Sequence, residues 1–359
     1  MSSLLFTFAL SLLGTWALVR VASKLGLLDR VFVGEQDRKP SRGDVPVVGG
    51  VAIVISLLAA RIFFGEAPAS AAGEGGFSEA WTWGAILCAF GVGLGDDRFG
   101  FRPRVKLLGQ ATAGLCLAVP ILLESESVGF GGALFEALAW FLGAMIAQNA
   151  INTFDNADGA ASSVVASALI LPSPVAAAAI VGFLPFNLSR REHAKIERPI
   201  LGDAGSHVLG ILLLLNPVAW PVLALPLLDL ARVSIVRVRR GIAPWVGDRR
   251  HLAHRLELAG FSPVQVVCAL LAIALPTALV PFLESSVWAL ASSVLLTTVL
   301  FASAVRFSPN PDQVKVLRSA PPRRDDSRAN PVLHGPLAHS SVVPPAVPAR
   351  PRSASSLAR

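Results

Sequence analysis

The amino-acid sequence predicts an all-α, polytopic integral membrane protein. Hydrophobic residues make up 53% of the 359 residues and charged residues only 15%, and the mean hydropathy is +0.61. Soluble domains carry about 25% charged residues. Apolar runs of near-spanning length recur along the chain, and the loops between them alternate between rich and poor in cations. These observations together predict about 10–11 transmembrane helices.

The apolar segments are long enough, or nearly so, to cross the hydrocarbon core of a bilayer. The sixth to ninth are short and poorly separated, which leaves the count open by one or two. The predicted segments cover residues 3–25, 46–64, 79–95, 105–123, 134–153, 160–172, 174–188, 206–218, 219–235, 263–281 and 286–305.

The Lys and Arg residues set the predicted orientation. They gather in four loops, near residues 30–42, 98–106, 190–198 and 237–255, whereas the intervening loops hold none and Arg61 is the one cation near the opposite face. Cation-rich loops stay in the cytoplasm. The net charge of +7 therefore reflects membrane orientation, and no compact basic domain is present for nucleic acid.

The chain divides by composition into a membrane domain, residues 1–305, and a tail, residues 306–359. The tail is rich in Pro, Ser, Ala and Arg. Such a segment cannot bury a core, so we expect it to be disordered in the cytoplasm.

Acidic and amide side chains collect next to the predicted cytoplasmic loops. Asp96 and Asp97 are adjacent, and a divalent metal would relieve their repulsion; a solvated acidic turn balanced by Arg98 explains them equally well. Asn149, Asn152, Asp155, Asn156 and Asp158 follow at spacings that place several of them on one helical face. A polar helix cap needs one such residue, so this run favours a functional site.

Two further clusters lie closer to the C-terminus. Gly202-Asp203-Ala204-Gly205-Ser206 precedes an apolar helix, where the helix N-terminus suits phosphate and plain capping is the alternative. His251 and His254 lie among Arg249, Arg250 and Arg255, a grouping that suits a diphosphate. A juxtamembrane basic helix on anionic lipids is the alternative there.

Six stretches together resemble the polyprenyl-phosphate N-acetylhexosamine-1-phosphate transferases, which include the phospho-MurNAc-pentapeptide translocase. The histidine stretch is closer to the UDP-GlcNAc branch of that family. The resemblance covers about residues 20–305, and the stretches occur in the family's order. They are Asp37–Gly50, Gly95–Gly100, Asn149–Gly159, Gly182–Asn187, Gly202–Ser206 and His251–Leu256.

The resemblance implies a Mg²⁺-dependent enzyme, with Mn²⁺ as an alternative ion, that moves a sugar-1-phosphate from a UDP-sugar to undecaprenyl or another polyprenyl phosphate and releases UMP. It implies a bacterial cytoplasmic (inner) membrane protein with a cytoplasmic active site, and it leaves a homodimer open. The implied metal ligands are Asp203 and Asp97. The implied catalytic residues are Asp96, Asp97, Asp155, Asp158 and His251, and the implied substrate-binding residues are Lys39, Arg42, Asn149, Asn152, Asn187, Arg250 and His254.

The sequence departs from the family pattern at Asn156, Ser41 and Ala253, which bears on sugar specificity more than on the reaction. Two other classes of membrane protein fit the sequence less well. A CDP-alcohol phosphatidyltransferase shares the Asp-x-x-Asp-Gly pattern, but the Ala-Arg and later acids of that motif do not follow Gly159. A transporter would place its acids at the bilayer midplane, whereas these acids cluster at one face.

Overall fold

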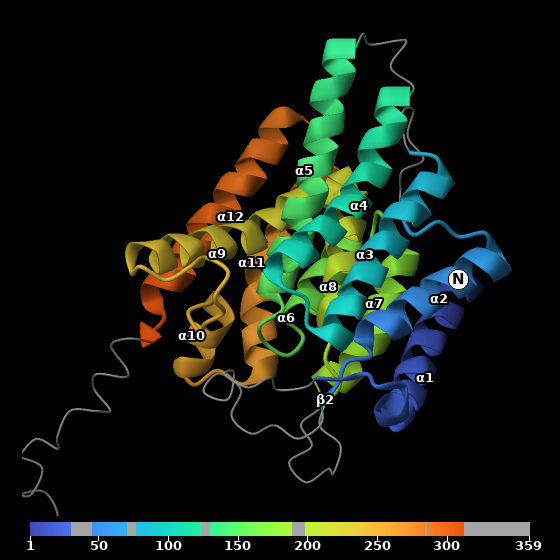
Figure 1. Ribbon diagram of the computed structural model, residues 1–359. Helices are drawn as coiled ribbons and strands as arrows, with labels where there is room; N and C mark the ends of the chain where they lie inside the picture. Colours follow the sequence, from blue (N-terminus) through green and yellow to red (C-terminus); the bar gives the residue numbers. More distant parts are fainter. Residues whose placement is uncertain (30–44, 70–76, 124–129, 189–197, 284–285, 312–359) are drawn as a thin grey trace, which may run out of the picture. The chain divides into compact units, whose positions relative to one another are not determined.

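The computed structural model describes residues 1–29, 45–69, 77–123, 130–188, 198–283 and 286–311, and within them the chain is almost entirely helical (Figure 1). The helices and the two short strands, in chain order, are α1 Ser2–Leu25, β1 Leu28–Asp29, β2 Val45–Pro46, α2 Gly49–Phe64, α3 Glu79–Phe99, α4 Pro103–Leu123, α5 Phe130–Phe154, α6 Ala160–Leu169, α7 Pro174–Asn187, α8 Gly202–Leu214, the 3₁₀ turn η2 Pro217–Ala219, α9 Trp220–Arg239, α10 Leu252–Leu258, α11 Pro263–Leu283 and α12 Val287–Phe307.

Each predicted apolar segment corresponds to a helix of the structure, with most boundaries shifted by a few residues. Six helices of the described part are long and apolar enough to cross a membrane, namely α1, α4, α5, α9 with its preceding turn, α11 and α12. Four more, α2, α6, α7 and α8, are apolar but have only 10–17 residues. The all-α, multi-pass membrane fold is therefore confirmed.

The outer helices bury small hydroxyl residues and expose large apolar ones. In α1 the buried positions Ser3, Thr7, Ser11 and Thr15 recur every four residues, while Leu13 is 62% exposed. In a membrane the lipid solvates apolar surface, and small residues let helices approach closely. This burial pattern is the one expected for helices that face lipid.

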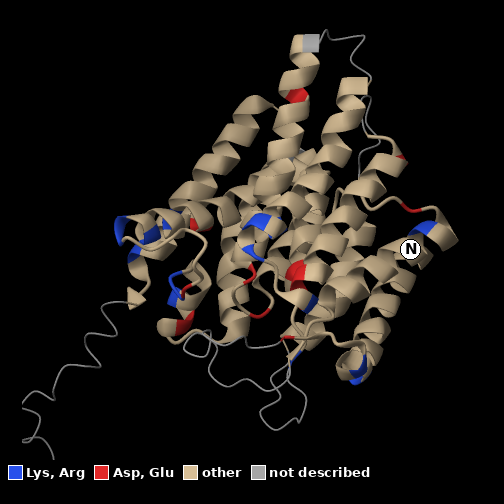
Figure 2. Cartoon of the chain, in the orientation of Figure 1, with Lys and Arg blue, Asp and Glu red and all other residues tan. Residues whose placement is uncertain are grey.

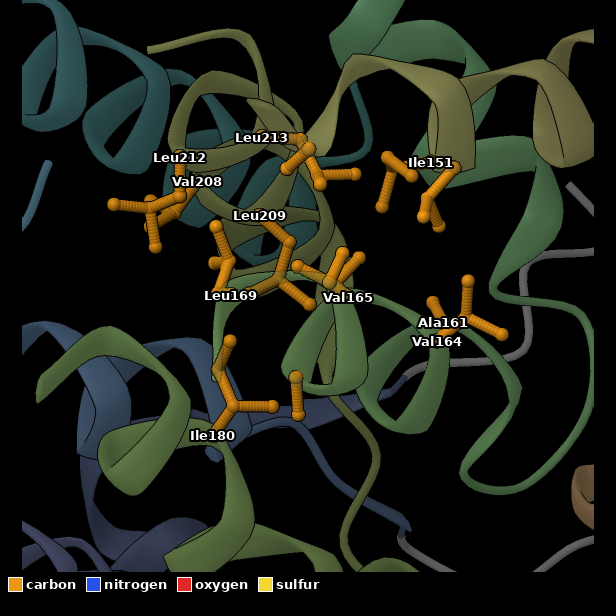
Figure 3. Packing of buried hydrophobic residues seen from close by; sticks show 14 of the residues in the cluster. Ile151, Ala161, Val164, Val165, Leu169, Ile180, Val208, Leu209, Leu212 and Leu213 are labelled. Carbon is orange, nitrogen blue, oxygen red and sulfur yellow. The ribbon is translucent and has the colours of Figure 1, made fainter. Parts of the chain in front are cut away.

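Helix α8 lies among α3, α5, α6 and α2 (Figure 1). Every residue from Ala204 to Leu214 is buried, as a helix that is hydrophobic all round requires. Figure 3 shows its side chains Val208, Leu209, Leu212 and Leu213 packed with residues of α5, α6 and α7. The N-terminus of α8 is thereby fixed at one end of the helical core.

A short backbone joint holds the segment before α8 against the start of α2. Strands β1 and β2 pair antiparallel, and Val47 bridges to Ile200 in parallel. The amide N–H groups of Gly49 and Gly50 donate to the carbonyls of Ile200 and Leu201 at 3.2 and 3.0 Å. A Cβ on Gly50 would lie 2.2 Å from the Gly205 nitrogen, so this close approach requires glycine.

Charged residues gather toward one end of the helices, the lower end in Figure 2. The opposite end holds an ion pair between Arg61 of α2 and Glu79 of α3. Arg61, the cation that lies on the wrong side of the predicted charge pattern, therefore has an acidic partner.

Candidate active site

Four helices bring polar side chains together around the ammonium group of Lys106, at the start of α4. Its Nζ lies 2.9 Å from Asp96 Oδ2 and 2.5 Å from Asp203 Oδ2, and it donates to Asn152 Oδ1 at 3.2 Å. Asp96, Asn152 and Asp203 come from α3, α5 and α8. Three oxygens thus surround one cation, and we call Lys106, Asp96, Asn152 and Asp203 the acid cage.

Asn152 ties the cage to the first turn of α8. Its amide Nδ2 donates to Asp203 Oδ1 and to Ser206 Oγ, the latter at 2.9 Å. Because Nδ2 donates here and Oδ1 faces Lys106, the amide orientation is fixed by its neighbours. The side chain that the sequence predicted to bind substrate therefore also holds Asp203 in place.

Asp97 faces away from Lys106 and toward the backbone of α8. Its Oδ1 accepts the Asp203 N–H at 2.8 Å, and its Oδ2 accepts the Ala204 N–H at 2.9 Å. These amides belong to the helical turn whose N–H groups have no partner within the helix. The structure therefore shows Asp97 capping α8 from another helix, and its predicted role as a metal ligand and catalytic group stays a prediction.

A second polar layer lies one helical turn from the cage, on the side away from the charged end of the helices. Asn149 Nδ2 donates to Gln110 Oε1 at 2.6 Å, and Gln110 Nε2 lies 3.1 Å from His207 Nε2. Gln110 and His207 are fully buried. Each is four residues after a cage residue on its helix, Lys106 or Asp203, so the two layers share helix faces. Asn149, a predicted substrate ligand, contacts this supporting layer.

The loop after α5 carries the two acids of the second predicted cluster. Burial, and then the charges of Asp203, Asp158 and Asp97, raise the pKa of Asp155 to about 8. Asp158 forms an ion pair with Arg198. A carboxyl group whose pKa is raised by burial and by neighbouring acids is typical of functional sites. The loop therefore adds a group that can hold a proton next to the cage.

Asn187 fixes this loop from α7. Its Oδ1 accepts the Gly159 N–H at 2.6 Å and its Nδ2 donates to the Pro199 carbonyl at 3.1 Å, and the residue is 3% exposed. The structure thus shows that Asn187, which was predicted to bind substrate, holds this loop in place. Its substrate contact remains a prediction.

His251 lies in a separate network between α9 and α10. Its Nδ1 is 2.7 Å from Asp229 Oδ2 and its Nε2 is 3.3 Å from Arg237 Nη2. Arg237 also donates to Asp248 Oδ2 at 3.1 Å. Arginine has no acceptor, so Nε2 must accept and Nδ1 must donate to Asp229. The neutral imidazole therefore has both nitrogens engaged, and its predicted catalytic role stays a prediction.

The two remaining predicted residues of this region, Arg250 and His254, each pair with an acidic side chain. Arg250 binds Asp248 Oδ2 at 2.8 Å, and His254 Nδ1 lies 2.9 Å from Glu257 Oε2. Hydrogen bonds from Arg237 and Arg250 hold the pKa of Asp248 below its usual range, although burial alone would raise it. The structure records no hydrogen bond from these described residues to the acid cage.

The structure brings together Asp96, Asp97, Asn152 and Asp203, and it places Asp155 close enough for their charges to act on it. Lys39 and Arg42 lie outside the described residues. Sequence reasoning treated Lys106 and Arg198 only as loop cations, and it missed Gln110, His207 and Asp229. The spacing of four between Lys106 and Gln110, and between Asp203 and His207, is the signal that could have found the second layer.

Asp96 and Asp203 are candidate ligands for a magnesium ion that would be shared with a phosphate-bearing substrate. Among the described residues, no group of three or more His, Cys, Asp or Glu side chains is arranged to hold a metal by itself. Mg²⁺ commonly binds one or two carboxylates together with substrate phosphates and water. Asp96 and Asp203 offer such carboxylate oxygens, and Lys106 Nζ contacts one oxygen of each.

Comparison with known proteins indicates that this multi-pass membrane protein is an enzyme. Residues 80–220 match the sequence profile of glycosyl transferase family 4. That range includes the cage, the Asp155–Gly159 loop and the second polar layer. The family and the relatives below indicate a phospho-sugar transferase, and the resemblance predicted from the sequence is confirmed.

Three similar proteins align with this chain over most of their own length. The chain is 25% identical to the undecaprenyl-phosphate alpha-N-acetylglucosaminyl 1-phosphate transferase of Yersinia pestis, over 74% of this chain and 78% of that protein. It is 25% identical to the protein of the same name from Escherichia coli K12, over 68% and 73%. It is 28% identical to the decaprenyl-phosphate N-acetylglucosaminephosphotransferase of Mycobacterium leprae, over 62% and 69%.

Proposed function

We propose that the protein transfers N-acetylglucosamine 1-phosphate, or a closely related N-acetylhexosamine 1-phosphate, from a UDP-sugar to a polyprenyl phosphate and releases UMP. The observation that carries the proposal is the acid cage, in which Asp96, Asp203 and Asn152 converge on Lys106. The names of the bacterial relatives support the choice of substrates.

The reaction brings two phosphate-bearing anions together, so the site must supply positive charge. Lys106 provides one cation, and Asp96 and Asp203 would hold Mg²⁺ beside it. When bound, Mg²⁺ would offset charge on the diphosphate and on the departing UMP. Asn152 keeps the Asp203 carboxylate in place through its amide, which limits the reorganisation that the reaction requires.

The attacking oxygen is that of the lipid phosphate, which forms a new bond to the β-phosphorus of the UDP-sugar as the bond to UMP breaks. We propose that Asp155 lies beside this exchange. With a pKa of about 8, it can accept or return a proton near neutral pH. Arg198, which forms an ion pair with Asp158, would bind phosphate oxygens once that ion pair opens.

To test the function, purified protein in nanodiscs is supplied with undecaprenyl phosphate, Mg²⁺ and one UDP-sugar at a time. The sugars are UDP-GlcNAc, UDP-GalNAc and UDP-MurNAc-pentapeptide, and the products are measured as UMP release and by mass spectrometry of the lipid. We expect a lipid-linked diphosphate sugar with UDP-GlcNAc. Release of UMP without a lipid product, or no release with any sugar, contradicts the proposal.

We also propose that the cage faces the cytoplasm, on the grounds of the cation-rich loops at its end of the helices. The test places single cysteines at Arg249 and at Trp288, in a background without Cys88, Cys116 and Cys268. Arg249 is 65% exposed near the cage end, and Trp288 is 79% exposed at the opposite end. In intact cells an impermeant thiol reagent should label only Trp288→Cys; labelling of Arg249→Cys reverses the orientation.

A further inference from the structure

The adjacent acids at the end of α3 serve different partners. Asp96 faces Lys106 at 2.9 Å and also accepts the Phe101 N–H at 2.6 Å. Asp97 gives both of its oxygens to the amides of Asp203 and Ala204. Neighbouring residues on an α-helix point about 100° apart, so one acid can face the cage while the other faces α8.

Helix α8 has no side-chain cap of its own. Its N-cap position is Leu201, which offers no acceptor. The polar side chains of its first turns are used elsewhere, because Ser206 Oγ accepts from Asn152 and the Asp203 carboxylate faces Lys106. If the N–H groups of the first turn lack an acceptor in an apolar setting, the folded state loses free energy of stabilisation. Asp97 therefore supplies from α3 what the sequence of α8 lacks.

The contact at this point involves the two backbones directly. A Cβ on Gly93, one turn before Asp97, would lie 2.4 Å from both the Ala204 nitrogen and the Asp203 carbonyl oxygen. Gly202 has φ +76°, and a Cβ there would lie 2.7 Å from Asp97 Oδ2. Such spacing leaves no room for α8 to slide against α3 while the cap is intact.

We propose that Asp97 is a positioning residue, which caps α8 and thereby aims the Asp203 carboxylate at the cation in the acid cage. The backbone N–H of Asp203 donates to Asp97, whereas its carboxylate contacts Lys106. Asp203 therefore links the cap to the cage. This inference rests on the proposed function for its kinetic consequence, whereas the cap itself can be tested without turnover.

The first test is hydrogen–deuterium exchange on substrate-free protein in nanodiscs without Mg²⁺. Asp97→Asn removes the charge and turns an N–H group toward amides that need an acceptor. We expect at least tenfold faster exchange in the peptide that contains residues 201–206. Asp96→Asn is the matched control, since Asp96 does not contact those amides, and its exchange there should equal that of the wild type.

The second test measures the Mg²⁺ dependence of turnover in the same variants. With Asp203 misaimed, folded Asp97→Asn should need at least fivefold more Mg²⁺ for half-maximal activity and should lose at least tenfold in kcat. If Asp97→Asn does not fold, Asp97→Glu takes its place, because it keeps two acceptor oxygens but displaces the helix end. We expect the same rise in Mg²⁺ requirement from it.

The outcomes separate the alternatives. Lost activity with unchanged exchange at residues 201–206 overturns the proposal, because Asp97 then acts on metal or substrate directly. Faster exchange with an unchanged Mg²⁺ requirement also overturns it, since the cap then serves stability alone. If the wild type turns over no UDP-sugar, the proposed function fails, while the exchange experiment still decides whether Asp97 caps α8.

Discussion

Asp229 and His251 are 22 residues apart in the chain, and their side chains meet through a contact of 2.7 Å between Oδ2 and Nδ1. Both are nearly inaccessible, at 1% and 4% side-chain exposure. Asp229 Oδ1 also accepts the Leu252 N–H at 3.1 Å, at the start of α10. One carboxylate thus holds both the imidazole and the helix that follows it.

We predict that Asp229→Asn destabilises the protein strongly. Removing one partner of a buried ion pair costs about 3–5 kcal/mol, and Asp229 forms such a pair with Arg232. Thermal unfolding in nanodiscs measures the loss. His251→Gln should destabilise too, and the double variant should lose less than the sum of the two. Strictly additive losses would show that the pair is not coupled.

Gly93→Ala should disturb the acid cage from outside it. The added Cβ meets the backbone of Asp203 and Ala204 at 2.4 Å, and backbone cannot move aside as a side chain does. We expect about 1–3 kcal/mol of destabilisation, typical of overpacking, with a large loss of activity. Gly91→Ala on the same helix is the control, because nothing lies within 4 Å of its Cβ. Equal melting temperatures in the two variants would argue against the tight contact.

Asp155→Asn should lower activity and raise stability in substrate-free protein without Mg²⁺. The pKa of Asp155 is raised to about 8 by burial and neighbouring acids, so the folded state binds its proton more tightly than the unfolded state does. Wild-type stability therefore falls as pH rises from about 4 to about 8. The variant lacks this group, so its advantage in melting temperature should be larger at pH 8 than at pH 5. An advantage that shrinks with rising pH contradicts the assignment.

Removal of the tail after Pro311 should leave transfer activity intact. At the end of α12, within the described residues, Arg255 donates to the carbonyls of Val305 and Ser308 at 2.7 Å. A cut after residue 304 removes those acceptors and should reduce stability and activity. Activity lost already in the longer variant would assign a function to residues 312–359.

The helices were largely predictable because membrane-spanning segments are recognisable in the sequence by their length and their apolar composition. The structure confirmed a helix at each predicted position, and for α7 it differs from the predicted range by one residue. The sequence was less informative about which helices form the centre of the bundle. Helix α8 is short and fully buried, whereas α1 buries its hydroxyls instead of its leucines. Hydropathy alone reports both as apolar and cannot distinguish lipid from protein neighbours.

The composition of the site was only partly predictable, for a reason of geometry. Asp96 and Asp203 were recognised as acids near a membrane surface, but their common partner Lys106 belongs to a run of loop cations with no distinguishing mark. Asp97 looks equivalent to Asp96 in the sequence. Only the packing of α3 on α8 shows that the two carboxylates face different groups. Asp229 was missed because it lies inside an apolar helix without a neighbouring motif.

The central claim is that the acid cage carries out phosphoglycosyl transfer, and UMP release by Asp203→Asn tests it most directly. The variant keeps the size of the side chain but replaces a carboxylate oxygen near Lys106 by an amide. In folded protein with UDP-GlcNAc, undecaprenyl phosphate and saturating Mg²⁺, the account predicts a fall in the rate of about 10²–10³-fold or more, on the scale seen when one charge-stabilising group is removed. Near-wild-type UMP release across Mg²⁺ concentrations would contradict it.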